Sequence, residues 1–140
     1  MWKGYAQKIF FIISNNFKVI SAPVTFYNQQ NLFEKLQTVE FEYLIGVGAS
    51  SIFNKYPITC NGANFIYERE VFNELGGFKD IDNIAAGDDE LFLHKVNSKY
   101  PNSAGFVKAE SAIVRTYAKD TLAEFIQQRK RWASNSTGST

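Results

Sequence analysis

Three adjacent carboxylates, Asp88, Asp89 and Glu90, are the residues of this sequence whose types and spacing best suit chemistry. They follow Gly87 where a loop meets a predicted helix, so Asp88 can simply cap the exposed amides of the first turn. Capping needs only one acid, however, and three neighbouring acids repel one another. Such crowding raises the pKa of a carboxyl group toward a value that suits a general base. The cluster is therefore either a helix cap or an acid–base site.

A second group lies at the end of the predicted C-terminal helix, in the segment Gln127-Gln128-Arg129-Lys130-Arg131-Trp132. Basic residues in a last turn complement the helix dipole without any further function. Arg131 and Trp132 offer more, because a guanidinium can fork onto phosphate oxygens and an indole can stack on a ring. A sugar diphosphate has both features.

Other candidate motifs favour structural interpretations. Asp80-Ile81-Asp82 has the spacing of a divalent-ion ligand pair, but it follows glycines in a predicted surface loop. Gly46-Val47-Gly48 follows a predicted helix rather than a strand, so glycine caps at a helix end explain it better than a phosphate loop. Cys60 is expected to be a small buried residue, and His94 to lie on the helix that begins at Asp88.

Composition narrows the classes of function. The 140 residues include 15 Lys plus Arg and 14 Asp plus Glu, a formal net charge of +1, so no nucleic-acid partner is implied. The single Cys and single His argue against a disulfide framework and a histidine metal site, and they favour a reducing compartment. The longest apolar stretches, 9–13 and 43–49, are far shorter than the roughly 20 residues of a membrane span. Hydrophobic residues make up 45% of the chain, which predicts one folded α/β or α+β domain.

The elements that must position the carboxylates and the Arg–Trp pair follow from periodicity and turn signals. Residues 5–15 fit either a helix or a strand, and both alternatives stay open. The pattern predicts strands at 19–24, at 58–67 with an interruption at 61–64, at Val107 and at 112–117. It predicts helices at 31–45, 68–75, 88–98 and 121–132, the last with a capping box formed by Thr121 and Glu124. Residues 134–140 contain no core residues and are expected to be a frayed tail.

Taken in order, four motifs resemble those of the family 2 glycosyltransferases, especially the membrane-associated enzymes related to cellulose, chitin and hyaluronan synthases. The motifs are Cys60-Asn61-Gly62-Ala63-Asn64, the segment from Glu70-Val71-Phe72 to Gly76-Gly77-Phe78, Gly87-Asp88-Asp89-Glu90-Leu91, and Gln128-Arg129-Lys130-Arg131-Trp132. Each motif alone has low specificity, whereas the four in this order are specific.

The resemblance assigns roles to individual residues. Asp89 matches the catalytic base that deprotonates the acceptor hydroxyl, and Asp88 stands where the family usually has Glu. Gln128, Arg131 and Trp132 match the QxxRW motif, which implies contacts to the donor diphosphate and a wall for the acceptor sugar. The turn from Gly62 to Asn64 would lie near the acceptor, because small residues let the backbone approach a sugar.

The resemblance also implies a fold and an architecture. We expect an α/β, partial nucleotide-diphospho-sugar transferase (GT-A type) fold, with a mixed sheet flanked by helices. Residues 1–133 would form the acceptor-side half of the catalytic domain. The nucleotide-binding half that normally precedes such a region, with its metal-binding DxD, is not recognisable before Val19. The chain is therefore expected to be a fragment that is inactive alone and contains no metal site of its own.

Partners follow from the same resemblance. The intact enzyme would transfer a sugar with inversion from a nucleotide-diphosphate donor, expected to be a UDP-sugar, to a carbohydrate or lipid-linked acceptor. A divalent metal, Mg or Mn, would be held mostly by residues outside this chain. Flanking segments would attach the enzyme to the cytoplasmic face of a membrane. A non-catalytic carbohydrate-binding or assembly module is the alternative that the residues leave open.

Overall fold

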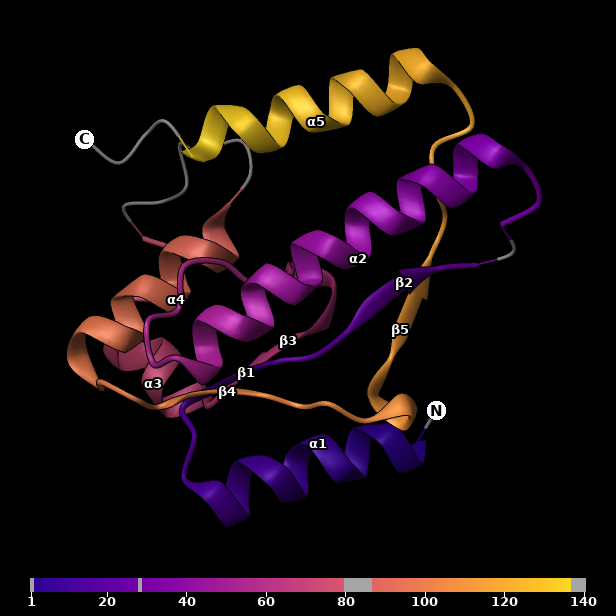
Figure 1. The fold of residues 1–140 in the computed structure, drawn as a ribbon. Helices are drawn as coiled ribbons and strands as arrows, with labels where there is room; N and C mark the ends of the chain where they lie inside the picture. Colours follow the sequence, from indigo (N-terminus) through magenta and orange to yellow (C-terminus); the bar gives the residue numbers. More distant parts are fainter. Residues whose placement is uncertain (1, 28, 80–86, 137–140) are drawn as a thin grey trace.

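A computed structural model describes residues 2–27, 29–79 and 87–136. The elements follow one another as α1 (Trp2–Asn15), β1 (Val19–Ser21), β2 (Val24–Phe26), α2 (Leu32–Phe53), η1 (Gly62–Asn64), β3 (Phe65–Tyr67), α3 (Arg69–Glu74), α4 (Asp88–Lys99), β4 (Ala104–Phe106), η2 (Glu110–Ala112), β5 (Val114–Thr116) and α5 (Leu122–Ser136) (Figure 1). None of these helices is long and apolar enough to cross a membrane.

Short strands form the centre of the molecule. One sheet has the order β3-β1-β4, in which β1 is antiparallel to β3 and parallel to β4, and a second sheet pairs β2 with β5 in parallel. The predicted strand at 19–24 is in fact two strands, because Ala22 and Pro23 separate β1 from β2. Proline has no N–H to donate to a ladder, which fits this break. The α/β class with a mixed sheet is confirmed, and the partial GT-A assignment stays a prediction.

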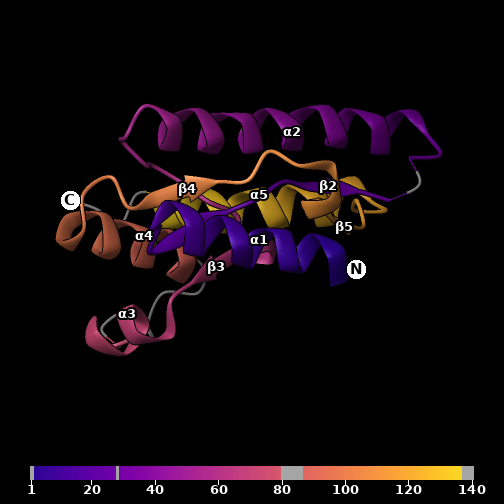
Figure 2. The same ribbon diagram turned by 90° about the horizontal axis from the view of Figure 1, so that it is seen from below.

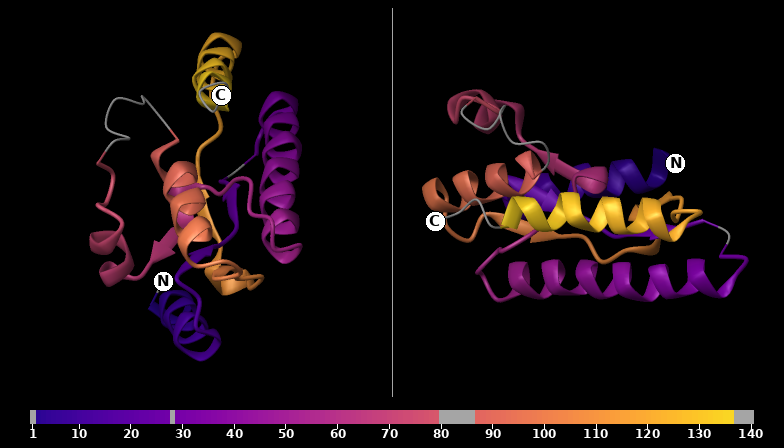
Figure 3. Two further views of the ribbon diagram at one scale, coloured as in Figure 1. Left: turned by 90° about the vertical axis from the view of Figure 1, so that its left-hand side faces the viewer. Right: turned by 90° about the horizontal axis from the view of Figure 1, so that it is seen from above.

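Helices cover both sides of these strands. Figure 2 shows α2 along one side and α1, α4 and α3 toward the other, and Figure 3 shows the same separation of α2 from α4. The long helix α2 begins with a capping box, in which the Asn31 side chain accepts from the Glu34 amide at 2.8 Å. The C-terminal helix α5 begins with the capping box predicted at Thr121 and Glu124, which is confirmed.

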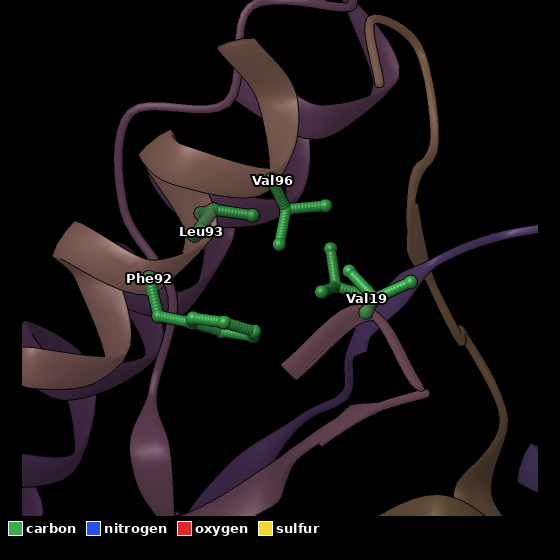
Figure 4. Close-up of a cluster of buried hydrophobic side chains, with 5 residues drawn as sticks. Val19, Phe92, Leu93 and Val96 are labelled. Atoms are coloured by element: carbon green, nitrogen blue, oxygen red, sulfur yellow. The ribbon is translucent and has the colours of Figure 1, made fainter. Parts of the chain in front are cut away.

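An aromatic cluster anchors α4 to the mixed sheet. Phe92, Leu93 and Val96 are fully buried and point toward Val19 of β1 (Figure 4). The Phe92 ring packs against four others, with ring centroids 5.0 to 6.4 Å apart; the four are Phe65, Tyr67, Phe72 and Phe78. Many of the phenylalanines therefore belong to the core. Because Asp89 lies one turn before Phe92, this packing fixes the start of α4.

The helix predicted at 31–45 is α2, which continues to Phe53. The predicted end before Gly46 is therefore wrong. Each interior glycine costs a helix about 1 kcal/mol, which packing offsets here. Gly48 is buried, and a Cβ at this position would lie 3.2 Å from the carbonyl oxygen of Thr59. The glycine thus lets the chain that returns toward residue 60 pack closely on α2.

Asp88 does not occupy the N-cap position of α4, although its Oδ1 does accept from a first-turn amide, that of Asp89. Gly87 occupies the N-cap position of α4 with φ 94°, a left-handed conformation that glycine adopts without strain, and Asp88 is the first helical residue.

Element bounds differ from prediction at several other places. The open segment 5–15 is helical, and the segment 58–67 is a strand only in β3. The strand predicted at Val107 is wrong by one residue, because β4 ends at Phe106, and the strand predicted at 112–117 is the shorter β5. The last helix extends past Trp132 to Ser136, so residues 134–136 are helical. Asp80 and Asp82, together with tail residues 137–140, lie outside the described residues.

Candidate active site

A cavity of about 790 Å³ lies between α2, the segment 58–63, the start of α4 and the last turns of α5. Its apolar wall comes from α2 and α5, including Phe41, Leu44 and Trp132. Most of the polar groups come from the other two segments, and Glu40 of α2 and Arg129 of α5 add two charged groups. The predicted site residues that line this cavity are Asp88, Asp89, Gly62 and Trp132.

Asp89 is a half-buried carboxylate at this cavity. Burial raises the pKa of its carboxyl group, and repulsion from Asp88 adds to the rise. Backbone hydrogen bonds from Glu90 and Gly62 oppose the shift by stabilising the charged form, and the Glu90 amide donates to Asp89 Oδ1 at 2.9 Å. The sequence predicted a raised pKa from crowding of acids, whereas burial is the larger cause. The outcome is a carboxyl group that holds its proton more tightly than an exposed aspartate, which is the direction of shift that favours a general base.

The turn at Gly62 lies directly against Asp89. A Cβ added to Gly62 would be 2.5 Å from Asp89 Oδ2, so only glycine leaves room for the carboxylate in this position. The turn itself is held by Asn61, whose side-chain oxygen accepts from the Ala63 amide at 3.0 Å. The structure thus shows that the predicted acceptor turn and the predicted base are neighbours.

Asn64 is placed away from the cavity, although it belongs to the same motif. The residue is buried, and its Nδ2 donates to the carbonyl oxygens of Pro23 at 2.7 Å and Ala112 at 2.8 Å. Its Oδ1 accepts from the buried Lys8 Nζ at 2.5 Å. Burial also lowers the pKa of Lys8. These bonds tie the Gly62 turn to α1, to the link between β1 and β2 and to η2, so Asn64 supports the site from behind.

The other two acids of the cluster also line the cavity. Asp88 is exposed, and its Oδ1 accepts from the Asp89 amide at 3.1 Å. Glu90 is half-buried, and its Oε2 accepts from Thr59 Oγ1 at 2.9 Å. Neither carboxylate is paired with a cation in these bonds, and the three acids together make this end of the cavity strongly acidic.

The residues of the QxxRW motif lie in different surroundings on α5. Trp132 is half-buried, packs on Phe41 at a ring-centroid distance of 6.0 Å and lines the cavity. Arg131 is exposed, and Gln128 is half-buried with its Oε1 accepting from Arg129 Nη1 at 2.7 Å. Neither Gln128 nor Arg131 is among the residues that line the cavity.

Residues to which the sequence assigned no functional role complete the wall. Arg129 and Glu40 both line the cavity and bind each other across 89 positions of sequence, which no local pattern reveals. Cys60 also lines it, and burial raises the pKa of its thiol, with the nearby Asp89 and Glu90 charges adding to the rise. The thiol is therefore neutral at physiological pH.

The charges of the cavity constrain what it binds. Four carboxylates, from Glu40, Asp88, Asp89 and Glu90, face one guanidinium, from Arg129, which Glu40 already neutralises. Such a cavity repels phosphate groups and suits a ligand with hydroxyl donors and an apolar face. Among residues 2–27, 29–79 and 87–136, no group of three His, Cys, Asp or Glu side chains is placed to hold a metal ion.

One family model, described as Glycosyl transferase family group 2, matches residues 2–137. No curated protein and no solved structure gave a significant match.

Proposed function

Because the chain belongs to Glycosyl transferase family group 2, we propose that it forms the acceptor side of an inverting glycosyltransferase with Asp89 as general base. The family membership establishes glycosyl transfer in general, and the roles of individual residues are our proposal. The observation that carries it is the position of Asp89, which lines the cavity, is half-buried and has a raised pKa.

The chemistry of the cavity favours the acceptor over the donor. A donor diphosphate carries negative charge and would meet four carboxylates there, whereas an acceptor sugar presents hydroxyl groups and a ring with apolar faces. We therefore propose that the acceptor lies between Asp89 and the wall formed by Trp132 and Phe41. The glycine at position 62 lets the sugar and the Asp89 carboxylate share a narrow space.

In this mechanism Asp89 takes the proton from one acceptor hydroxyl as its oxygen attacks the anomeric carbon of the donor sugar. The new C–O bond forms on the face opposite the diphosphate, the bond from the anomeric carbon to the diphosphate breaks, and the nucleoside diphosphate leaves with the electron pair. The configuration of the anomeric carbon is thereby inverted. Half-burial of Asp89 suits this role, because a less solvated carboxylate is a stronger base.

We propose that the donor diphosphate binds outside this cavity, because the cavity is acidic. We propose a nucleotide-sugar donor, with UDP-sugars as the first to test, and a carbohydrate or lipid-linked acceptor. Arg131, which is exposed on α5, and Gln128 beside it would face the diphosphate outside the cavity.

The described residues do not form a divalent metal site. We therefore expect the ligands of Mg or Mn in another part of the enzyme, and the mechanism proposed for Asp89 does not use the metal. Attachment to the cytoplasmic face of a membrane, as in polysaccharide synthases, belongs to the same proposal.

The experiment is the substitution Asp89→Asn in the enzyme made from the full reading frame. We expect sugar transfer to fall by at least about a thousandfold, as for loss of an essential proton acceptor, while UDP binding measured by calorimetry persists. Asp120→Asn is the matched control, since Asp120 is exposed and does not line the cavity. Retained turnover in Asp89→Asn would refute the assignment of the base.

The same variant separates this function from a non-catalytic carbohydrate-binding module. A binding module would keep its affinity for cellobiose or chitobiose in the Asp89→Asn variant. Its unmodified form would transfer no sugar. Binding without any transfer by the unmodified enzyme, across UDP-glucose and UDP-N-acetylglucosamine, would favour the module.

A further inference from the structure

An ion pair joins α2 to α5 at the wall of the cavity. Arg129 Nε donates to Glu40 Oε1 at 2.8 Å, and Arg129 Nη2 donates to Glu40 Oε2. Two parallel bonds to one carboxylate fix both the position and the plane of the guanidinium. The pair is partly shielded from water, because the Arg129 side chain is only 17% exposed and that of Glu40 is 40% exposed.

The fixed guanidinium contacts two residues of the QxxRW motif. Its Cζ lies 4.3 Å from the centroid of the Trp132 ring, within the range of a cation–π contact, and its Nη1 donates to Gln128 Oε1. A further ring, Phe125, lies 4.3 Å from the same atom. One side chain, held by Glu40, therefore restrains both Trp132 and Gln128.

The Trp132 indole is contacted by the guanidinium and by a core ring. Arg129 covers one face of the indole, and Phe41 packs against it at a tilt of 32°. The indole is thus held between a charged group and the core. Arg131, in contrast, is exposed and does not line the cavity.

We propose that Arg129, bound by Glu40, is a positioning residue for acceptor binding, because it fixes the Trp132 indole at the cavity wall. The inference rests on the glycosyl transfer proposed above, in which Trp132 forms the acceptor wall. Arg129 acts through Trp132 and is not itself a catalytic residue.

The kinetic test uses the enzyme from the full reading frame, with UDP-glucose or UDP-N-acetylglucosamine as donor and cellobiose or chitobiose as acceptor. Arg129→Lys keeps the charge but loses the two-pronged bond and the planar stacking, and Glu40→Gln removes the carboxylate. We expect each to raise the KM for the acceptor roughly tenfold, with kcat changed less than about threefold, as for loss of a cation–π contact that orients a binding group. The double variant should be no worse than either single one.

Two comparisons separate positioning from a purely structural role. Glu74→Gln removes the Lys99–Glu74 pair, which joins α3 to α4 and does not line the cavity, and it should leave the acceptor KM unchanged. In a Trp132→Ala background, Arg129→Lys should have no further effect on that KM. An acceptor KM that stays within twofold of the parent value in Arg129→Lys, or that still rises tenfold without Trp132, would overturn the proposal.

A spectroscopic test does not depend on activity. The chain has two tryptophans, so Trp2→Phe leaves Trp132 as the reporter in the 140-residue protein. Adding Arg129→Lys should shift its emission to longer wavelength and increase quenching by acrylamide, and Glu74→Gln should do neither. If the parent enzyme transfers no sugar, the proposed function is refuted. Independently of that result, unchanged emission and quenching in the Arg129→Lys variant would refute the positioning of Trp132.

Discussion

The contact between Gly62 and Asp89 gives the sharpest prediction about the site. In Gly62→Ala, the new Cβ would lie 2.5 Å from Asp89 Oδ2 and 3.1 Å from Asp89 Cγ, whereas ordinary contacts begin at 3.4 Å. The φ angle of Gly62 is not in the left-handed region, so alanine itself is tolerated by the backbone. The contact is relieved when the Asp89 carboxylate moves.

The size of the effect follows from that displacement. The carboxylate oxygen must retreat by about 0.9 Å, the difference between the 2.5 Å contact and the 3.4 Å at which ordinary contacts begin. A misplacement of about 1 Å in a reacting group costs up to roughly a hundredfold in rate. This corresponds to about 2.7 kcal/mol in the activation free energy. We therefore expect kcat to fall by one to two orders of magnitude, with little change in stability.

The assay measures sugar transfer by the full-reading-frame enzyme and thermal unfolding of the same preparation. Gly46→Ala is the matched control, because a Cβ at Gly46 meets nothing within 4 Å and alanine favours the α2 helix. The control should retain activity and unfold at an equal or higher temperature. Unchanged kcat and KM in Gly62→Ala would refute the role of Asp89 as general base, because a general base must keep its position relative to the acceptor hydroxyl.

Two further predictions concern pH and the support behind the site. Because burial raises the pKa of Asp89, the native state binds its proton more tightly than the unfolded chain, whose Asp pKa is about 3.9. Ionisation of Asp89 therefore costs stability, and this cost grows as pH rises through the folded-state pKa. Asp89→Asn should raise the melting temperature at pH 7 but not at pH 3, whereas Asp120→Asn should raise it at neither pH. A difference in melting temperature between Asp89→Asn and the parent that is the same at both pH values would contradict this. Asn64→Leu removes the hydrogen-bond partner of Lys8 Nζ and one hydrogen bond from each of two carbonyl oxygens. It should lower the free energy of unfolding by roughly 2–5 kcal/mol in urea titrations. Asn73→Leu, at an exposed position, is the control, and equal stability of the two variants would refute the role of Asn64.

Local patterns were sufficient for several elements. The capping box at Thr121 and Glu124 correctly predicted the start of α5, because the bonds that form it join residues three apart. The helix at 68–75 was also predicted correctly, as α3. In contrast, Gly46 and Gly48 predicted a helix end that packing against the following chain overrides.

The candidate site also combines features that the sequence indicated with features that only the fold determined. The sequence by itself identified the family and the motifs that contain Gly62, Asp89 and Trp132, since residue types and their order carry that information. Only the tertiary structure decided which motif residues share the cavity, because this depends on how α2, α4 and α5 pack. It separated Asn64 from Gly62, two positions away, by burying one beneath the turn and leaving the other at the cavity. It also brought Glu40 to Arg129 from 89 positions away, a pairing that arises only when two helices lie side by side.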